Sequence, residues 1–202
     1  MYDKDDPWNF KANNKDFFQN LYSKLDDPWN FQTCEYEKEK YKQTLDLVCS
    51  FRPKTVLEIG CSIGLFTQQL ASVVEHVHAI DISLIALEKA KRQCQGLNNI
   101  DFIDTDLNDL ILPIQFDLIV ASEVFYYFDL TEESWQRTVN VLDNLLSRNG
   151  RIVCIVHEHH DNEVWDTYFP KFSTINLEKV DRNFSTGKPY TISVFKRELK
   201  MI

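Results

Sequence analysis

Residues 56–67 read Val56-Leu-Glu-Ile-Gly-Cys-Ser-Ile-Gly-Leu-Phe-Thr67, an apolar run that breaks at two glycines and passes directly into a helical pattern. This order predicts a strand, a tight turn and a helix that continues to Val74. The next apolar run, 76–80, ends at Asp81, 21 positions after Gly60. An α/β fold that binds adenosine places its ribose carboxylate at about this interval, so the pattern indicates a nucleoside cofactor.

The same loop indicates which cofactor it binds. A dinucleotide fingerprint requires three glycines, G-x-G-x-x-G, and this loop lacks the middle one. Glu58 at the strand end would add negative charge where a pyrophosphate must lie, whereas that charge attracts a ligand with a sulfonium and an ammonium. S-adenosylmethionine is such a ligand, and S-adenosylhomocysteine is its product. The alternative is a glycine pair that serves only a turn or helix packing, and the register with Asp81 favours the cofactor.

Length and composition favour one domain. A chain of 202 residues with 44% hydrophobic content can bury one core and is short for two ordinary domains. The acidic start and the absence of a long apolar run lead us to expect no signal peptide and no membrane span, and hence a cytoplasmic protein. A net charge of −9 opposes nucleic-acid binding, because neutralising phosphates requires a basic surface. The five scattered cysteines, including Cys61, predict reduced thiols and no zinc cluster.

Strands alternate with helices after the glycine loop, which predicts a mostly parallel, Rossmann-like sheet of seven strands with helices on both faces. We expect strands over 100–104, 116–121 and 151–156 and helices over 83–95, 163–169 and from Thr131 to Asn149-Gly150. Segments 174–180 and 190–196, joined by a polar turn over 185–189, predict a hairpin. The last strand should therefore run antiparallel.

The N-terminal region contains a duplication. Asp5-Asp-Pro-Trp-Asn-Phe10 recurs as Asp26-Asp-Pro-Trp-Asn-Phe31, and we expect only the second copy to lead into a helix, over 35–50. We therefore divide the chain into a flexible extension over 1–15 and one domain over 16–202. Within that domain, residues 16–50 would form a helical lid and residues 51–202 the Rossmann-like core.

Five separated motifs resemble the methyltransferases of the nodulation protein S family, which belong to the class I fold. In that family's order, the chain has Phe17-Phe18, Asp27-Pro-Trp29, Tyr36-Glu-Lys-Glu-Lys-Tyr41, Gly60-Cys-Ser-Ile-Gly64 and Ser122-Glu-Val-Phe-Tyr-Tyr127. The resemblance covers roughly residues 16–157 and implies N-methylation by S-adenosylmethionine, in the nodulation case on a free amino group of a glucosamine-containing oligosaccharide.

Two segments depart from the family pattern: Lys38-Glu39 replaces a basic pair, and His157-Glu-His-His160 matches no family pattern. In the glycine loop, Ser62 stands where class I methyltransferases more often have glycine. Strand alternation would place His157 and His159 on one side and their neighbours on the other, so we expect no metal site in this run.

The family resemblance and the strand ends together nominate the site residues. Glu58 would hold the methionine ammonium, Asp81 would accept both ribose hydroxyls, and Asp106 would face the adenine unless it is a solvated loop acid. Trp29, Tyr36 and Tyr41 would close the lid, unless they only dock the N-terminal helix. The expected cofactor contacts are Trp29, Tyr36, Glu58, Gly60, Cys61, Ser62, Gly64, Asp81, Ile82, Asp106, Leu107, Ser122 and Glu123.

Methyl transfer is an in-line displacement, so the protein mainly positions two reactants and excludes water. An acceptor amine must be neutral to attack, and His157 is the first candidate base and Glu123 the second. Tyr126, Tyr127 and His159 could wall a small-molecule acceptor such as an amino sugar or oligosaccharide, although the tyrosines could equally be core. The sequence leaves open O-methylation of a hydroxyl or carboxyl, a non-catalytic binding protein, and a monomer or homodimer.

Overall fold

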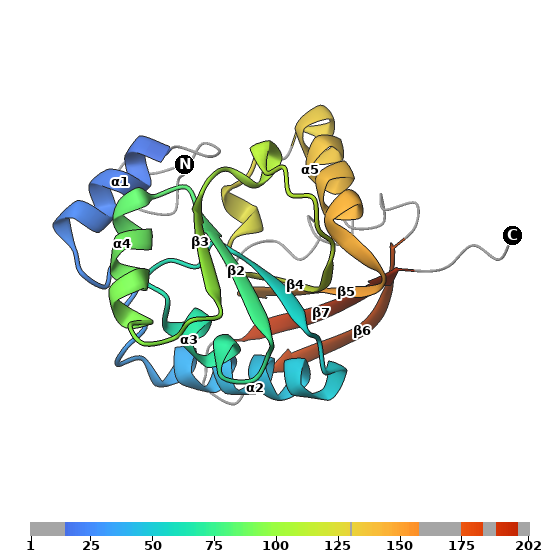
Figure 1. The fold of residues 1–202 in the computed structure, drawn as a ribbon, viewed down its shortest axis with the longest axis horizontal. Coiled ribbons are helices and arrows are strands. Elements are labelled where there is room, and N and C mark those ends of the chain that lie inside the picture. The colour runs from blue at the N-terminus through green and yellow to red at the C-terminus, as the bar shows by residue number, and fades with distance from the viewer. Residues whose placement is uncertain (1–14, 130, 158–174, 184–188, 198–202) are drawn as a thin grey trace, which may run out of the picture.

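The computed structural model describes residues 15–129, 131–157, 175–183 and 189–197 (Figure 1). The helices are α1 (Lys15–Lys24), α2 (Glu35–Phe51), α3 (Leu65–Ala71), α4 (Leu84–Gln93) and α5 (Glu132–Leu145). The strands are β1 (Thr55–Ile59), β2 (His76–Asp81), β3 (Ile100–Asp104), β4 (Phe116–Ser122), β5 (Leu146–His157), β6 (Ile175–Asn183) and β7 (Tyr190–Arg197). Two short 3-10 turns are η1 (Leu107–Asp109) and η2 (Phe125–Tyr127).

The strands form one seven-stranded sheet in the order β3-β2-β1-β4-β5-β7-β6. Neighbours from β3 to β5 pair in parallel, while β7 runs antiparallel to both β5 and β6. After β3 the chain crosses to the other side of β1 and continues with β4, so the strand order switches direction between β1 and β4. The Rossmann-like class predicted from the sequence, with its antiparallel last strand, is confirmed.

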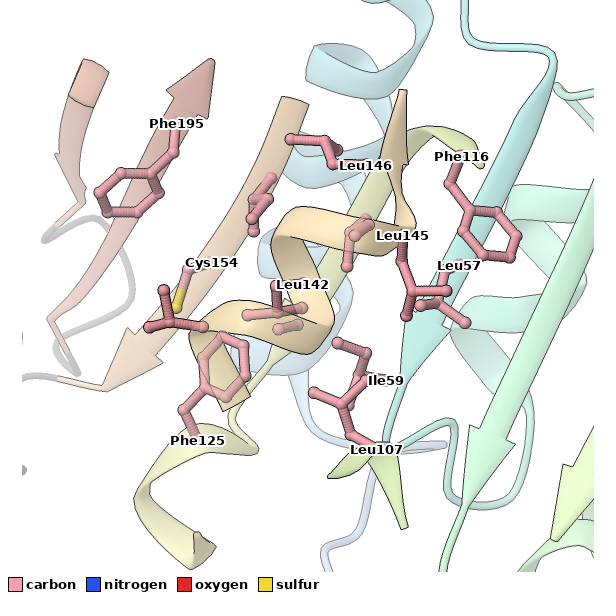
Figure 2. Packing of buried hydrophobic residues seen from close by; sticks show 14 of the residues in the cluster. Leu57, Ile59, Leu107, Phe116, Phe125, Leu142, Leu145, Leu146, Cys154 and Phe195 are labelled. Atoms are coloured by element: carbon pink, nitrogen blue, oxygen red, sulfur yellow. The ribbon is translucent and has the colours of Figure 1, made fainter. Parts of the chain in front are cut away.

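Apolar side chains fill both faces of the sheet, as expected for parallel strands that are covered on both sides. Because successive strand residues point to opposite faces, Val56 joins the cluster that includes α2 and α3 residues, and Leu57 joins the cluster that includes α5. Figure 2 shows the second cluster, where Leu142 and Leu145 of α5 lie near Leu57 and Ile59. In Figure 1, α2 and α3 lie on one side of the sheet and α5 on the other.

The junction between α5 and β5 differs from the sequence prediction. The helical pattern predicted a helix to Asn149-Gly150, but α5 ends at Leu145 and β5 begins at Leu146. Leu146 is fully buried and pairs with Phe116 of β4. Pairing with the sheet therefore outweighs the local helical period at this point, which a sequence pattern does not reveal.

The N-terminal helices correct a second prediction. α1 begins at Lys15, five positions after the first Asp-Asp-Pro-Trp-Asn-Phe copy, and α2 begins four positions after the second copy. The expectation that only the second copy leads into a helix is therefore wrong. α1 packs on α4, where Lys89 Nζ donates to the backbone oxygens of Tyr22 and Leu25 at 2.8 Å each. These tertiary contacts stabilise a helix that is too short to be stable alone.

Several predictions concern residues outside the described ranges. They are the state of residues 1–14, the helix over 163–169, most of the turn over 185–189 and the role of His159. The division into extension, lid and core stays a prediction. None of the helices in the described ranges combines the length and apolar character that a membrane crossing requires. The five cysteines are free thiols, and Cys61 is buried.

Candidate functional site

A pocket of about 820 Å³ opens at the carboxyl ends of β1, β2, β4 and β5, where the strand order switches direction. Side chains of α1, of α2 and of the segment between them line one part of it, and the segments at the carboxyl ends of β1 to β5 line the rest. Most of the residues nominated from the sequence meet here. Those in the wall are Trp29, Tyr36, Gly60, Ser62, Asp81, Ile82, Asp106, Leu107, Ser122, Glu123, Tyr126, Tyr127 and His157.

Three expected cofactor residues are buried behind this wall and do not line the pocket: Glu58, Cys61 and Gly64. Gly64 has a φ of 81°, and a Cβ there would lie 2.8 Å from the backbone of Ala90 in α4. Glycine at this position therefore lets the start of α3 pack against α4. The expected approach of Gly64 to a ligand stays a prediction beside this packing role.

Glu58 lies beneath the glycine loop, beside Thr67 of α3. Burial raises the pKa of the Glu58 carboxyl to about 8, the Thr67 hydroxyl opposes the rise, and the Asp81 charge adds to it. Within the described residues, Glu58 Oε2 has no hydrogen-bond partner. A carboxyl group with this pKa is mostly protonated at neutral pH. Burial therefore disfavours the charged form of Glu58, and its contact with the methionine ammonium stays a prediction.

The Glu58→Gln variant should gain stability relative to the wild type as the pH rises. The native pKa of about 8 lies above the ordinary value of 4.5, so the folded chain keeps a proton that the unfolded chain loses. Wild-type stability should therefore fall between these two pH values by on the order of 1 kcal/mol per pH unit, and the variant lacks this contribution.

Urea unfolding of both proteins at about pH 7 and about pH 8 measures this difference in the free energy of unfolding. This range lies above the pKa of about 6 of Asp81, whose titration would otherwise contribute. Equal slopes of stability against pH for the two proteins would contradict the prediction.

Asp81 connects the end of β2 to the glycine loop. Its Oδ2 accepts a hydrogen bond from Ser62 N at 2.9 Å, and its Oδ1 accepts one from Ser83 N at 2.8 Å. Burial raises the pKa of Asp81 to about 6, while these two backbone donors oppose the rise. The carboxylate therefore fixes the loop and the start of α4 in place, and the same side chain lines the pocket.

Tyr22 connects the lid to the glycine loop, and the sequence analysis did not nominate it. Ser62 has a φ of 51°, in the left-handed region where glycine is favoured. Its hydroxyl lies 2.6 Å from the Tyr22 hydroxyl, which also accepts a hydrogen bond from Trp29 Nε1 at 3.2 Å. Tyr22 belongs to α1, the helix that was not predicted. The sequence feature that could have indicated a hydrogen-bond partner such as Tyr22 was Ser62 itself, because it is a hydroxyl residue in a position where glycine is usual.

Glu123 is held at the pocket wall by donors from α2 and β5. Its Oε1 accepts hydrogen bonds from Lys40 Nζ at 3.2 Å and from the Tyr36 hydroxyl at 3.4 Å. Its Oε2 accepts one from the backbone N of His157 at 3.0 Å. The backbone φ of Glu123 is 54°, a value that is uncommon for a glutamate. Strained backbone conformations of this kind are often found at functional sites. Because all these partners donate, the carboxylate is fixed in one orientation at the pocket.

Lys40 and Glu37 are the charged residues that the sequence analysis missed. Lys40 is 1% exposed, and its Nζ donates to Glu37 Oε1 at 3.0 Å as well as to Glu123. The ammonium lies 5.0 Å from the ring centre of Tyr36 and 6.0 Å from that of Tyr41. Lys40, Glu37 and both tyrosines belong to the family motif Tyr36-Glu-Lys-Glu-Lys-Tyr41, in which the sequence had drawn attention to the tyrosines and to Lys38-Glu39. The pairing with Glu123, 83 positions away, has no local sequence signal.

Asp106 and Leu107 lie at the pocket side formed by the loop after β3. Asp106 Oδ1 accepts a hydrogen bond from Asn108 N at 2.8 Å and so caps η1. Asp106 is half-buried, and this burial raises the pKa of its carboxyl. Leu107 is buried and belongs to the core cluster as well as to the pocket wall.

Aromatic rings line the opposite side of the pocket. Tyr126 and Tyr127 are half-buried there, with ring centres 4.5 Å apart, and Phe18 of α1 meets Tyr127 edge-on at 5.2 Å. The His157 ring lies 5.7 Å from the ring of Tyr36. The two tyrosines therefore form part of the pocket wall, and do not lie wholly in the core.

The chain has clear relatives. Residues 10–166 match the family described as nodulation protein S. Nodulation protein S of Sinorhizobium fredii is 31% identical over 119 residues, which cover 58% of this chain and 55% of that protein. Phosphoethanolamine N-methyltransferase 1 of Zea mays is 29% identical over 124 residues, 60% of this chain and 24% of that protein. The chain spans about half the length of the nodulation proteins that it matches.

The fold also has solved counterparts. The crystal structure of N-methyltransferase NodS from Bradyrhizobium japonicum WM9 in complex with S-adenosyl-L-homocysteine superimposes with a TM-score of 0.80 and 22% identity. The superposition covers 93% of this chain and 100% of that one. At this identity the likeness shows the shared fold, whereas the family match extends over most of the sequence. By that match, the chain belongs to the nodulation protein S family.

Proposed function

We propose that this chain is an S-adenosylmethionine-dependent methyltransferase that methylates the amine of a small molecule such as an amino sugar. The observation that carries the proposal is one pocket with two chemically distinct sides. One side has Asp81 and Asp106 at the strand ends that suit a nucleoside, and the other has the fixed Glu123 carboxylate among aromatic rings. Relatives named as N-methyltransferases support the reaction type.

The residues of the first side fit the cofactor. Gly60 has a φ of 73°, and a Cβ there would lie 2.8 Å from Val124 Cγ2, so the loop backbone itself forms the wall. Asp81 holds the ribose, Asp106 and Leu107 hold the adenine edge, and Gly60 with Ser62 receives the methionine part. When bound, the cofactor supplies an electrophilic methyl group on a sulfonium. Glu58 contributes by supporting the loop from below.

The second side prepares the acceptor. Glu123 accepts a hydrogen bond from the acceptor N–H, which aims the nitrogen lone pair and offsets the positive charge that builds on nitrogen. His157, in the same wall, takes the proton that the methylated amine releases. Tyr126 and Tyr127 pack on the apolar faces of the acceptor and exclude water. No metal is needed for this reaction.

A free-amine test separates this proposal from its rivals. The protein is incubated with S-adenosylmethionine and either a glucosamine oligomer with a free amine or its fully N-acetylated counterpart, and products are analysed by mass spectrometry. We expect methylation of the free-amine oligomer alone. Methylation of both at similar rates would indicate O-methylation. Cofactor binding in calorimetry without transfer to any amine of a wider panel would indicate a non-catalytic binding protein.

Asp81→Ala should weaken S-adenosylmethionine binding by about 1.5 to 3 kcal/mol, the scale for losing hydrogen bonds to a charged group. The loss includes the ribose contacts and the fixing of the glycine loop through Ser62 N. Asp104→Ala is the matched control, because Asp104 ends the neighbouring strand and pairs with Asp81 in register but does not line the pocket. Calorimetry with both variants tests the assignment, and equal affinities for the two would contradict it.

A further inference from the structure

A second group of ligand-type side chains lies at the end of the sheet opposite the pocket. His76 and His78 occupy alternate positions of β2 and so share one face, and Asp101 of β3 pairs in register with His78. His76 and His78 lie five and three positions before Asp81 at the pocket, or about 17 and about 10 Å at the usual rise per residue. The group is therefore independent of the cofactor and acceptor residues.

The three side chains converge. Asp101 Oδ2 lies 3.0 Å from His76 Nε2 and 3.5 Å from His78 Nδ1. One ligand atom from each of the three residues lies within 4.8 Å of the other two. A tetrahedral zinc ion with its usual bond lengths holds its ligand atoms about 3.4 Å apart, so small rotations would bring all three onto one ion.

An ordinary His–Asp ion pair does not account for the whole group. Such a pair satisfies His76 and Asp101, but His78 Nδ1 is buried and has no hydrogen-bond partner among the described residues. The His78 ring packs edge-on against Phe116 at 5.2 Å, which holds that nitrogen toward Asp101. A buried ring nitrogen that faces a carboxylate oxygen without a hydrogen bond between them leaves room for a shared cation.

We propose that His76, His78 and Asp101 bind a divalent transition-metal ion, with zinc as the ion that best suits two imidazoles and one carboxylate. The side chains of His76 and Asp101 are 35% and 58% exposed, which gives the ion a path from solvent and a position for a water ligand. β3 is the edge strand of the sheet. The ion clamps this edge to β2 and has no part in methyl transfer.

Metal binding tests the proposal on the full chain after treatment with a chelator. Calorimetry with Zn²⁺ and absorbance with Co²⁺ are measured for the wild type, His76→Gln and Asp101→Asn, which change half-exposed side chains and leave the packed His78 ring in place. The controls are Glu75→Gln, a neighbouring exposed acid paired with Lys54, and the double variant His159→Asn with His160→Asn. Thermal unfolding with and without Zn²⁺ is recorded in parallel.

We expect one Zn²⁺ per wild-type chain, at least a tenfold weaker affinity in each ligand variant, and unchanged affinity in both controls. Zn²⁺ should raise the melting temperature of the wild type and of the controls but not of His76→Gln. Absence of binding would overturn the proposal, and so would equal affinity in the ligand variants or loss of binding in the double variant. A Co²⁺–thiolate band in the absorbance would assign the ion to a cysteine and likewise overturn it.

Discussion

Replacing Glu123 by glutamine should lower the rate of methyl transfer by about a hundredfold or more, while cofactor affinity changes little. Glutamine keeps the size of the side chain but loses the charge that offsets the developing ammonium. It also turns an amide N–H₂ toward partners that all donate: Lys40 Nζ, the Tyr36 hydroxyl and the backbone N of His157. The acceptor would then meet a misaligned and neutral group.

Steady-state kinetics with a free-amine acceptor measure this effect, and calorimetry with S-adenosylmethionine separates it from cofactor binding. His157→Asn is the informative companion. If His157 takes the proton, His157→Asn should transfer the methyl group more slowly than the wild type at every pH tested, with an unchanged affinity for S-adenosylmethionine. Activity of Glu123→Gln within a few-fold of the wild type would remove Glu123 from the proposed mechanism.

Lys40→Met should destabilise the protein by about 3 to 5 kcal/mol, the scale for removing one partner of a buried ion pair. The ammonium is 1% exposed and lies between Glu37 and Glu123, so its loss leaves two largely buried carboxylates without the cation that they share. Methionine fills most of the lysine volume, which limits the contribution of a cavity. Urea unfolding measures the change.

The helix itself supplies a matched control. Lys38 pairs with Glu35 at the same i, i+3 spacing as Lys40 with Glu37, but its side chain is 52% exposed. Lys38→Met should therefore cost no more than about 0.5 kcal/mol. Adding Glu37→Gln to Lys40→Met should recover part of the loss, because one of the two unpaired charges is removed. Equal effects of the Lys38 and Lys40 substitutions would show that the buried network contributes little.

The sequence by itself determined the fold class and the location of the site. Apolar runs such as 76–80 and 116–121 are local patterns with the strand period, and a polar residue that ends such a run must lie at the edge of a parallel sheet. That is why Asp81, Ser122 and Glu123 could be nominated without a structure, and all three line the pocket. The family motifs added Trp29 and Tyr36 of the lid.

Only the tertiary structure decided which charges these residues carry and which partners they meet. Burial beneath the loop raises the pKa of Glu58 and so disfavours the charge that its sequence position suggested. Lys40 reaches Glu123 across 83 positions, and Asp101 joins His76 across 25. Desolvation and long-range contact depend on how the elements pack, whereas a sequence pattern reports only on neighbours within one element. α1 could not be predicted for the same reason, since its stability comes from its packing on α4.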